Sequence, residues 1–135
     1  MNTSFDHEKL SVYQEAIKFV VWSDEILETL PKTLAVHSQF DRAATSISLN
    51  IAEGNGKYTA ADRCRFFDIA RGSALECAAC LDVLVAKKRL VEAGPGKEML
   101  VRIVSMLVGL IRSTSPDRVH EDGGSYVTRS DEPAR

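Results

Sequence analysis

The sequence predicts an all-α protein: an antiparallel up-down-up-down four-helix bundle with a disordered C-terminal tail. Apolar residues recur at helical spacing in four separate stretches, whereas strand-like alternation is convincing nowhere. Short segments rich in proline or glycine separate these stretches, and short connections between amphipathic helices are typical of antiparallel bundles. The length of 135 residues suits one domain with one hydrophobic core.

The first two helices are expected over residues 8–30 and 38–53. Pro31 ends the first, because proline cannot continue a helix. Its predicted apolar stripe is Leu10, Tyr13, Ile17, Val20 and Leu27. The predicted stripe of the second is Phe40, Ala43, Ala44, Ile47 and Ile51. Gly54-Asn55-Gly56 follows, and glycine tolerates the left-handed conformation that commonly closes a helix.

The third helix is expected to run from Thr59 to about Leu90. The Thr59 hydroxyl can accept a hydrogen bond from the backbone amide of Asp62, which is typical of a helix start. One predicted apolar stripe is Phe66, Ala70, Ser73, Cys77 and Leu84. A second, beside it, is Phe67, Ala74, Ala78, Leu81 and Val85. Together they exceed the arc of about 100° that one-sided burial needs, so we interpret the second stripe as an oligomer interface.

The fourth helix is expected over residues 97–112, after the turn Gly94-Pro95-Gly96. Its apolar stripe is Leu100, Ile103, Leu107, Leu110 and Ile111. Residues 1–113 are therefore predicted to form the bundle. Residues 114–135 contain few large apolar side chains, so they cannot bury enough surface to offset the entropy of ordering, and we expect a disordered tail.

Charge and composition narrow the classes of function. Residues 1–113 hold 14 basic and 14 acidic residues, so nucleic-acid binding would need a local basic patch. No apolar run approaches the roughly 18 residues of a membrane span, and the polar N-terminus is unlike a secretory signal. The three clustered cysteines indicate reduced thiols. We therefore expect a cytoplasmic protein without a membrane partner.

Signals for catalysis or metal binding are weak. The Gly-x-Gly at 54–56 lacks the preceding strand of a phosphate-binding loop, and a helix end explains it better. Cys77 and Cys80 form a Cys-x-x-Cys without the second pair that zinc usually needs, so core packing explains them better than redox chemistry. An enzyme that uses Cys64, Cys77 and Cys80 as reactive thiols or as metal ligands is the least favoured class of function. We expect no enzymatic activity, no cofactor and no metal.

Polar residues near the second turn raise two further hypotheses. Asn50 and Glu53 stand three apart, and we interpret them as a structural polar bridge between the second and third helices, since catalysis would require a partner group.

The candidate nucleic-acid-binding residues are Lys57, Arg63, Arg65 and Arg71, with Tyr58 and Phe66 interleaved and available for stacking. The alternative is a solvated surface with ion pairs along the helix.

Four stretches carry a family resemblance: FDHEKLSVYQEA (5–16), LP (30–31), QFDRAATSISLNIAEGNGK (39–57) and RFFDIARGSALE (65–76). They resemble the four-helix-bundle proteins encoded in intervening sequences of bacterial 23S ribosomal RNA genes, to which the accessory protein of diversity-generating retroelements is related. The resemblance covers about residues 5–113. The positions that match the family's motif are Asn50, Glu53, Gly54, Arg65, Gly72, Ser73 and Glu76.

The resemblance implies a homopentameric ring with no established enzymatic activity. The retroelement branch is thought to bind nucleic acid and a reverse transcriptase through basic ring surfaces, although that branch is more basic than this chain. We therefore expect a non-enzymatic oligomeric scaffold or binding protein, with RNA or DNA contact through its basic residues. The alternative is a protein-binding adaptor for a client encoded nearby, without nucleic-acid binding.

Overall fold

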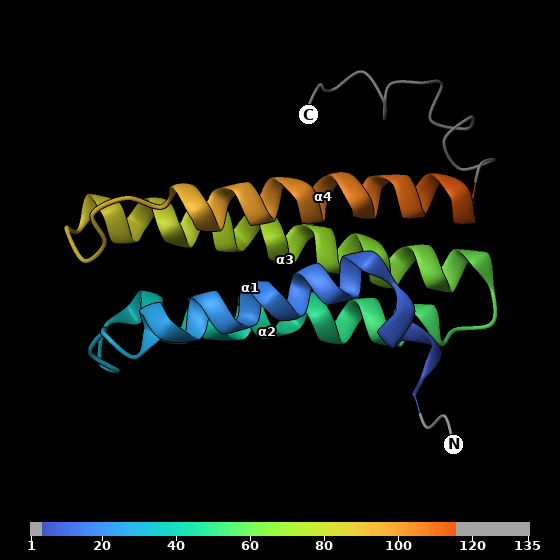
Figure 1. Cartoon of the computed structure of the whole chain (residues 1–135), viewed down its shortest axis with the longest axis horizontal. Coiled ribbons are helices and arrows are strands. Elements are labelled where there is room, and N and C mark those ends of the chain that lie inside the picture. The colour runs from blue at the N-terminus through green and yellow to red at the C-terminus, as the bar shows by residue number, and fades with distance from the viewer. Residues whose placement is uncertain (1–3, 116–135) are drawn as a thin grey trace.

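The computed structural model describes residues 4–115, which contain four long helices, one short helix and no strand. The elements are the 3-10 helix η1 (Asp6–Lys9) and the α-helices α1 (Ser11–Leu27), α2 (Ala35–Asn55), α3 (Ala60–Ala86) and α4 (Gly94–Thr114). The four long helices lie side by side along one axis (Figure 1). The predicted tail, residues 114–135, lies almost entirely outside the described residues.

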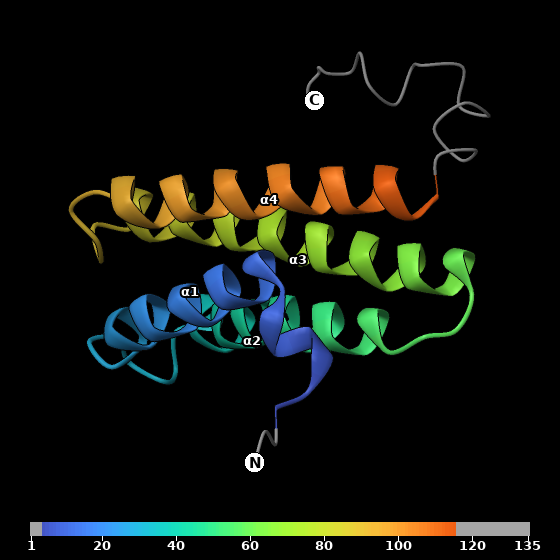
Figure 2. The ribbon, with the colours of Figure 1, turned by 45° about the vertical axis from the view of Figure 1, so that its right-hand side comes forward.

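Contacts between neighbouring helices establish the up-down-up-down topology. Ser46 lies against Ser73, and Gly54 lies against Phe66, so α2 and α3 run in opposite directions. Phe19–Phe40 and Asp6–Asn55 join the N-terminal segment of η1 and α1 to α2 in the same antiparallel sense. Cys64–Ile111 and Asp82–Lys97 do the same for α3 and α4, and Glu15–Arg102 joins α1 to α4. The α2–α3 turn, η1 and the C-terminal end of α4 consequently meet at one end of the bundle (Figures 1 and 2).

The core lies along the common seam of the four helices. Its largest fully buried side chains include Phe19, Phe40, Phe67, Ile47, Ile51, Leu81, Leu84, Ile103, Leu107 and Ile111. The stripe predicted for the second helix is buried throughout, which confirms it. The stripe predicted for the first helix is only partly right: Ile17 is 40% exposed, whereas Leu27 is buried and Leu10 and Tyr13 pack against the core. The buried residues of α1 are Val12, Ala16, Phe19, Ser23 and Leu27.

Of the two predictions for the turn between α2 and α3, the cap at the start of α3 is confirmed and the cap at the end of α2 is wrong. Thr59 Oγ1 accepts a hydrogen bond from the Asp62 amide at 3.1 Å, as the sequence predicts. Gly54, however, lies inside α2, and the capping Gly56 has φ −88°, so the predicted left-handed cap is absent. Gly54 has a packing role: a Cβ there would lie 2.9 Å from both Phe66 Cβ and Phe67 Cε1. Glycine therefore lets α2 and α3 approach closely.

The third helix is shorter than predicted, ending at Ala86 rather than near Leu90. Lys88 has φ 61°, and the Arg89 amide donates to the Leu84 carbonyl at 2.9 Å. The Lys88 amide donates to the Val85 carbonyl at 3.0 Å, which completes a Schellman motif with lysine at the position that usually holds glycine. The left-handed conformation reverses the chain here, and it costs a residue with a Cβ roughly 1–2 kcal/mol.

Replacing Lys88 with glycine is expected to stabilise the bundle by about 0.5–1 kcal/mol, because relief of backbone strain exceeds the added entropy of the unfolded chain. The midpoint of urea unfolding measures the change. Lys87→Gly is the matched control, since Lys87 has φ −83° and gains nothing from glycine. Equal shifts for both variants would contradict the strain at Lys88.

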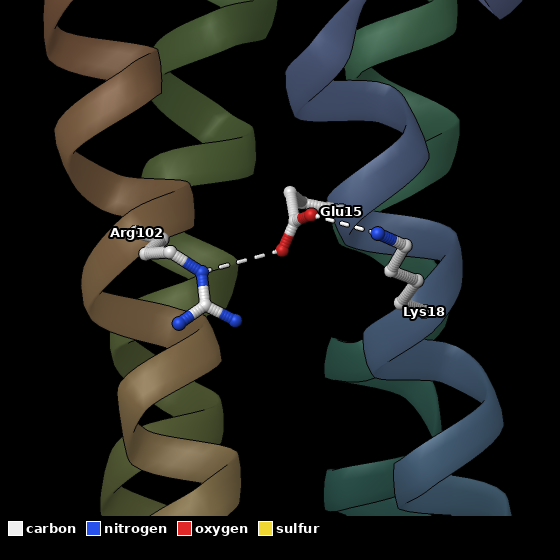
Figure 3. Close-up of polar contacts among 3 residues, drawn as sticks. All are labelled: Glu15, Lys18 and Arg102. Atoms are coloured by element: carbon white, nitrogen blue, oxygen red, sulfur yellow. Dashed lines mark hydrogen bonds and ion pairs between the residues drawn. The ribbon is translucent and has the colours of Figure 1, made fainter.

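One polar bridge ties α1 to α4. Glu15 lies between Lys18, whose Nζ is 3.2 Å from Oε2, and Arg102, whose Nε is 3.4 Å from Oε1 (Figure 3). The hydrogen bond from Lys18, together with the charge of Arg102, holds the pKa of the Glu15 carboxyl below its usual value, against the opposing effect of desolvation. Arg102 thus links two helices that are distant in sequence through a carboxylate that stays ionised.

Glu15→Gln is expected to cost at most about 1 kcal/mol of unfolding free energy at pH 7, as for other partly exposed ion pairs. Because the folded-state pKa of Glu15 is lowered, its contribution is fully present above the unfolded pKa of about 4.5 and is lost as the pH falls through the lower folded-state pKa. Urea unfolding at pH 7 and pH 3.5 measures this. Glu25→Gln is the control, since Glu25 forms no ion pair within residues 4–115. A difference that is as large at pH 3.5 as at pH 7 would contradict the ion pair.

Candidate interaction surfaces

The residues of the predicted family motif gather on one surface of the bundle. Residues 42, 46, 49, 50 and 53 of α2 follow one another at spacings of one, three or four, and residues 65, 69, 72, 73 and 76 of α3 do the same. The contact between Ser46 and Ser73 sets these two rows side by side. We call this surface the outer α2–α3 face: Arg42, Ser46, Leu49, Asn50, Glu53, Arg65, Ile69, Gly72, Ser73 and Glu76. Gly54 lies beneath it.

A short polar chain joins the two helices at the centre of this face. Asn50 Nδ2 donates to Ser46 Oγ at 2.8 Å and to the Ser46 carbonyl at 2.9 Å. Ser46 Oγ lies 2.9 Å from Ser73 Oγ, which completes the connection to α3. Glu53 does not take part, because its carboxylate points to Lys57, 3.8 Å away, along its own helix. The bridge between α2 and α3 is therefore built from two serines and Asn50, and Ser46 was not anticipated.

The same face leaves apolar side chains uncovered. Leu49 of α2 is 61% exposed and Ile69 of α3 is 42% exposed. Gly72 is exposed in the interior of α3, and a Cβ there would meet nothing within 4 Å. Glycine inside a helix costs about 0.5–1 kcal/mol relative to alanine, and nothing within the described chain requires it at this position.

The predicted oligomer interface lies mostly inside the bundle. Phe67, Ala74 and Leu81 are fully buried within one chain, so the prediction that they contact another copy is wrong. Ala78 is half-buried and Val85 remains 38% exposed. The wide apolar arc of the third helix is occupied by its own neighbours, because α3 packs against both α2 and α4. A helix with two flanking partners needs a wider apolar arc than a helix with one.

The four predicted basic residues do not form one patch. Lys57 Nζ lies 4.9 Å from the centre of the Phe66 ring, and Arg65 Cζ lies 4.6 Å from it, so both cations share one aromatic side chain. We call Lys57, Tyr58, Arg65 and Phe66 the basic turn. It lies at the end of the bundle where α2 passes into α3 (Figure 1).

Arg63 and Arg71 lie apart from the basic turn. Arg63 contacts Asn55 at 3.4 Å, and its Nε is buried without a hydrogen-bond partner among the described residues. Arg71 Nε is 3.1 Å from Asp68 Oδ1, and its position is about 120° around α3 from Arg65 at 100° per residue. The structure thus brings together two of the four predicted cations.

The described residues contain no arrangement typical of an active site. Burial raises the pKa of the Cys77 and Cys80 thiols, which disfavours the reactive thiolate. Residues 4–115 also lack any group of three or more His, Cys, Asp or Glu that could hold a metal ion. A shallow hollow follows α2, but its ends, His37 and Glu53, are 16 residues apart, or about 24 Å along the helix, too far to act on one substrate.

These features define a class: an all-α four-helix-bundle protein whose candidate functional regions are an outer helix face and a turn. Residues 8–109 match the model of the family described as 23S rRNA-intervening sequence protein, and the chain belongs to that family. It is also similar to the crystal structure of a protein of unknown function from the S23 ribosomal protein family of Bacteroides thetaiotaomicron. That likeness has a TM-score of 0.70 and 23% sequence identity, and covers 74% of this chain and 97% of the other.

No curated protein matches this chain. The predicted family is confirmed, and so is the four-helix architecture. None of the helices within residues 4–115 is long and apolar enough to cross a membrane.

Proposed function

We propose that the protein is a non-enzymatic scaffold of the cytoplasm that assembles from several copies through the central part of the outer α2–α3 face, around Gly72, and leaves Arg65 at the end of that face uncovered. The observation that carries the proposal is Gly72, an exposed glycine in a helix interior between uncovered apolar neighbours. A second chain packed over Gly72 would account for the absent side chain, because small residues allow close approach of a neighbouring helix. It would also cover Leu49 and Ile69.

A closed ring requires two unlike surfaces on each copy, because head-to-tail contacts join different patches. The second surface is supported by Val101 of α4, which is 65% exposed and lies on another helix than Gly72. Leu75 of α3, which is 49% exposed, lies three residues from Gly72, only about 60° around the helix, and so borders the outer α2–α3 face. The family resemblance favours five copies.

Sedimentation velocity at micromolar concentration tests the assembly. Five copies of a 14.9 kDa chain are expected at about 75 kDa. Gly72→Gln is expected to shift the protein to the single-chain mass without loss of helicity, because the site is open in one chain. Val21→Gln is the control, since Val21 is 58% exposed on α1, a helix that contributes to neither proposed surface.

A wild-type protein that sediments as one folded chain would overturn the assembly. An oligomer that Gly72→Gln leaves intact would place the interface elsewhere.

A second part of the proposal is contact with RNA or DNA at the basic turn. Its support is the position of Lys57 and Arg65 against the same Phe66 side chain. A closed oligomer would carry several copies of this small patch, so that weak contacts made by each copy would add up to a higher affinity. Binding should weaken steeply between 50 and about 200 mM salt, because phosphate contacts release counterions. The alternative function, a protein-binding adaptor, predicts salt-insensitive capture of a protein and no binding of an oligonucleotide.

A further inference from the structure

The basic turn carries a fully uncovered aromatic ring. Tyr58 has a relative exposure of 102%, so the described chain covers none of its side chain. Lys57 and Arg65, in contrast to Tyr58, do contact another side chain, since both lie against the ring of Phe66. An aromatic ring usually buries much of its surface, and one that projects freely beside cations is available for stacking.

Charge alone is a poor basis for binding at this turn. Glu53 pairs with Lys57 at 3.8 Å, and Asp62 lies in the first turn of α3, so two carboxylates balance the two cations. A rigid duplex offers mainly phosphates to a protruding turn, because its base faces are stacked inside. A single strand offers phosphates and also the faces of its bases, which stack on aromatic side chains.

We propose that the basic turn binds single-stranded RNA or DNA in preference to duplex, with a base stacked on Tyr58 and neighbouring phosphates contacting Lys57 and Arg65. This inference rests on the proposed nucleic-acid contact and specifies its ligand. Arg65 is the better placed cation, because it forms no ion pair in the part of the chain that the structure describes. Because the local charges nearly cancel, the stacked base is the main reason why the basic turn would prefer a single strand to a duplex.

Fluorescence anisotropy with the full chain tests this inference. The probes are a labelled single strand of about 16 nucleotides with mixed sequence, as RNA and as DNA, and the corresponding DNA duplex. We expect the single strands to bind at least about 10-fold more tightly than the duplex, and Tyr58→Ala to weaken single-strand binding about 5- to 100-fold. Tyr58→Phe keeps the ring and should retain the affinity. Because Tyr58 is uncovered, neither variant should change stability.

The outcomes separate this inference from the proposed function. Equal binding of single strand and duplex, lost in Arg65→Gln but unchanged in Tyr58→Ala, would overturn the stacked base and keep a phosphate contact. Single-strand binding that Tyr58→Phe abolishes as completely as Tyr58→Ala would also overturn it, because the ring would then not suffice. No binding of any probe at 50 mM salt would overturn both and favour the protein-binding adaptor.

Discussion

Gly54→Ala is expected to destabilise the bundle by about 2–3 kcal/mol, even though alanine is the better helix former. The added methyl group would lie 2.9 Å from Phe66 Cβ and from Phe67 Cε1. The first of these atoms is fixed to the backbone of α3, and the second belongs to a fully buried ring, so neither can move aside cheaply. The two helices must separate, and the contacts that surround Gly54 loosen with them.

Urea unfolding followed by circular dichroism measures this effect. Gly109→Ala is the matched control: the same substitution in a helix interior, with nothing within 4 Å of the new Cβ. We expect it to stabilise the bundle by about 0.5–1 kcal/mol through helix propensity alone. If both variants gain stability, the close approach of α2 and α3 at Gly54 is not a constraint.

Ala74→Glu is expected to unfold most of the protein at pH 7. Ala74 is fully buried in the centre of α3, and an unpaired carboxylate there loses its hydration without a compensating partner. The cost of several kcal/mol is comparable with the whole stability of a small domain. Loss of helical circular dichroism measures the effect. Ala79→Glu is the control, since Ala79 is exposed on the same helix and should change stability by less than about 0.5 kcal/mol.

The pH dependence of Ala74→Glu has a definite sign. Burial raises the pKa of the introduced carboxyl in the folded state, so the penalty is largest at neutral pH and shrinks as the pH falls and the group is protonated. Helix content should therefore recover partly between pH 7 and about pH 5. A variant that is fully folded at pH 7 and has lost only its assembly would show that Ala74 faces another copy after all.

The family motif could be found in the sequence, but the contacts that its residues make could not. Asn50, Gly72 and Glu76 are separated by up to 26 residues in the chain, and only the antiparallel contact of α2 with α3 places them on one face. Ser46 lies within the stretch 39–57 that carries the family resemblance, but the sequence does not show what it contacts, because its role depends on Ser73 being opposite. Likewise, Lys57 and Arg65 become neighbours only through the Phe66 ring.

The sequence by itself determined four helices, their approximate order and limits, and the Thr59 cap, because helical periodicity, proline, glycine and capping residues act within a few positions along the chain. Only the tertiary structure decided which apolar stripe of α1 faces inward, and that Phe67, Ala74 and Leu81 are core residues rather than interface. An amphipathic pattern specifies that a face must be covered. Whether a helix of the same chain or another molecule covers it depends on distances between segments remote in sequence, which no local pattern encodes.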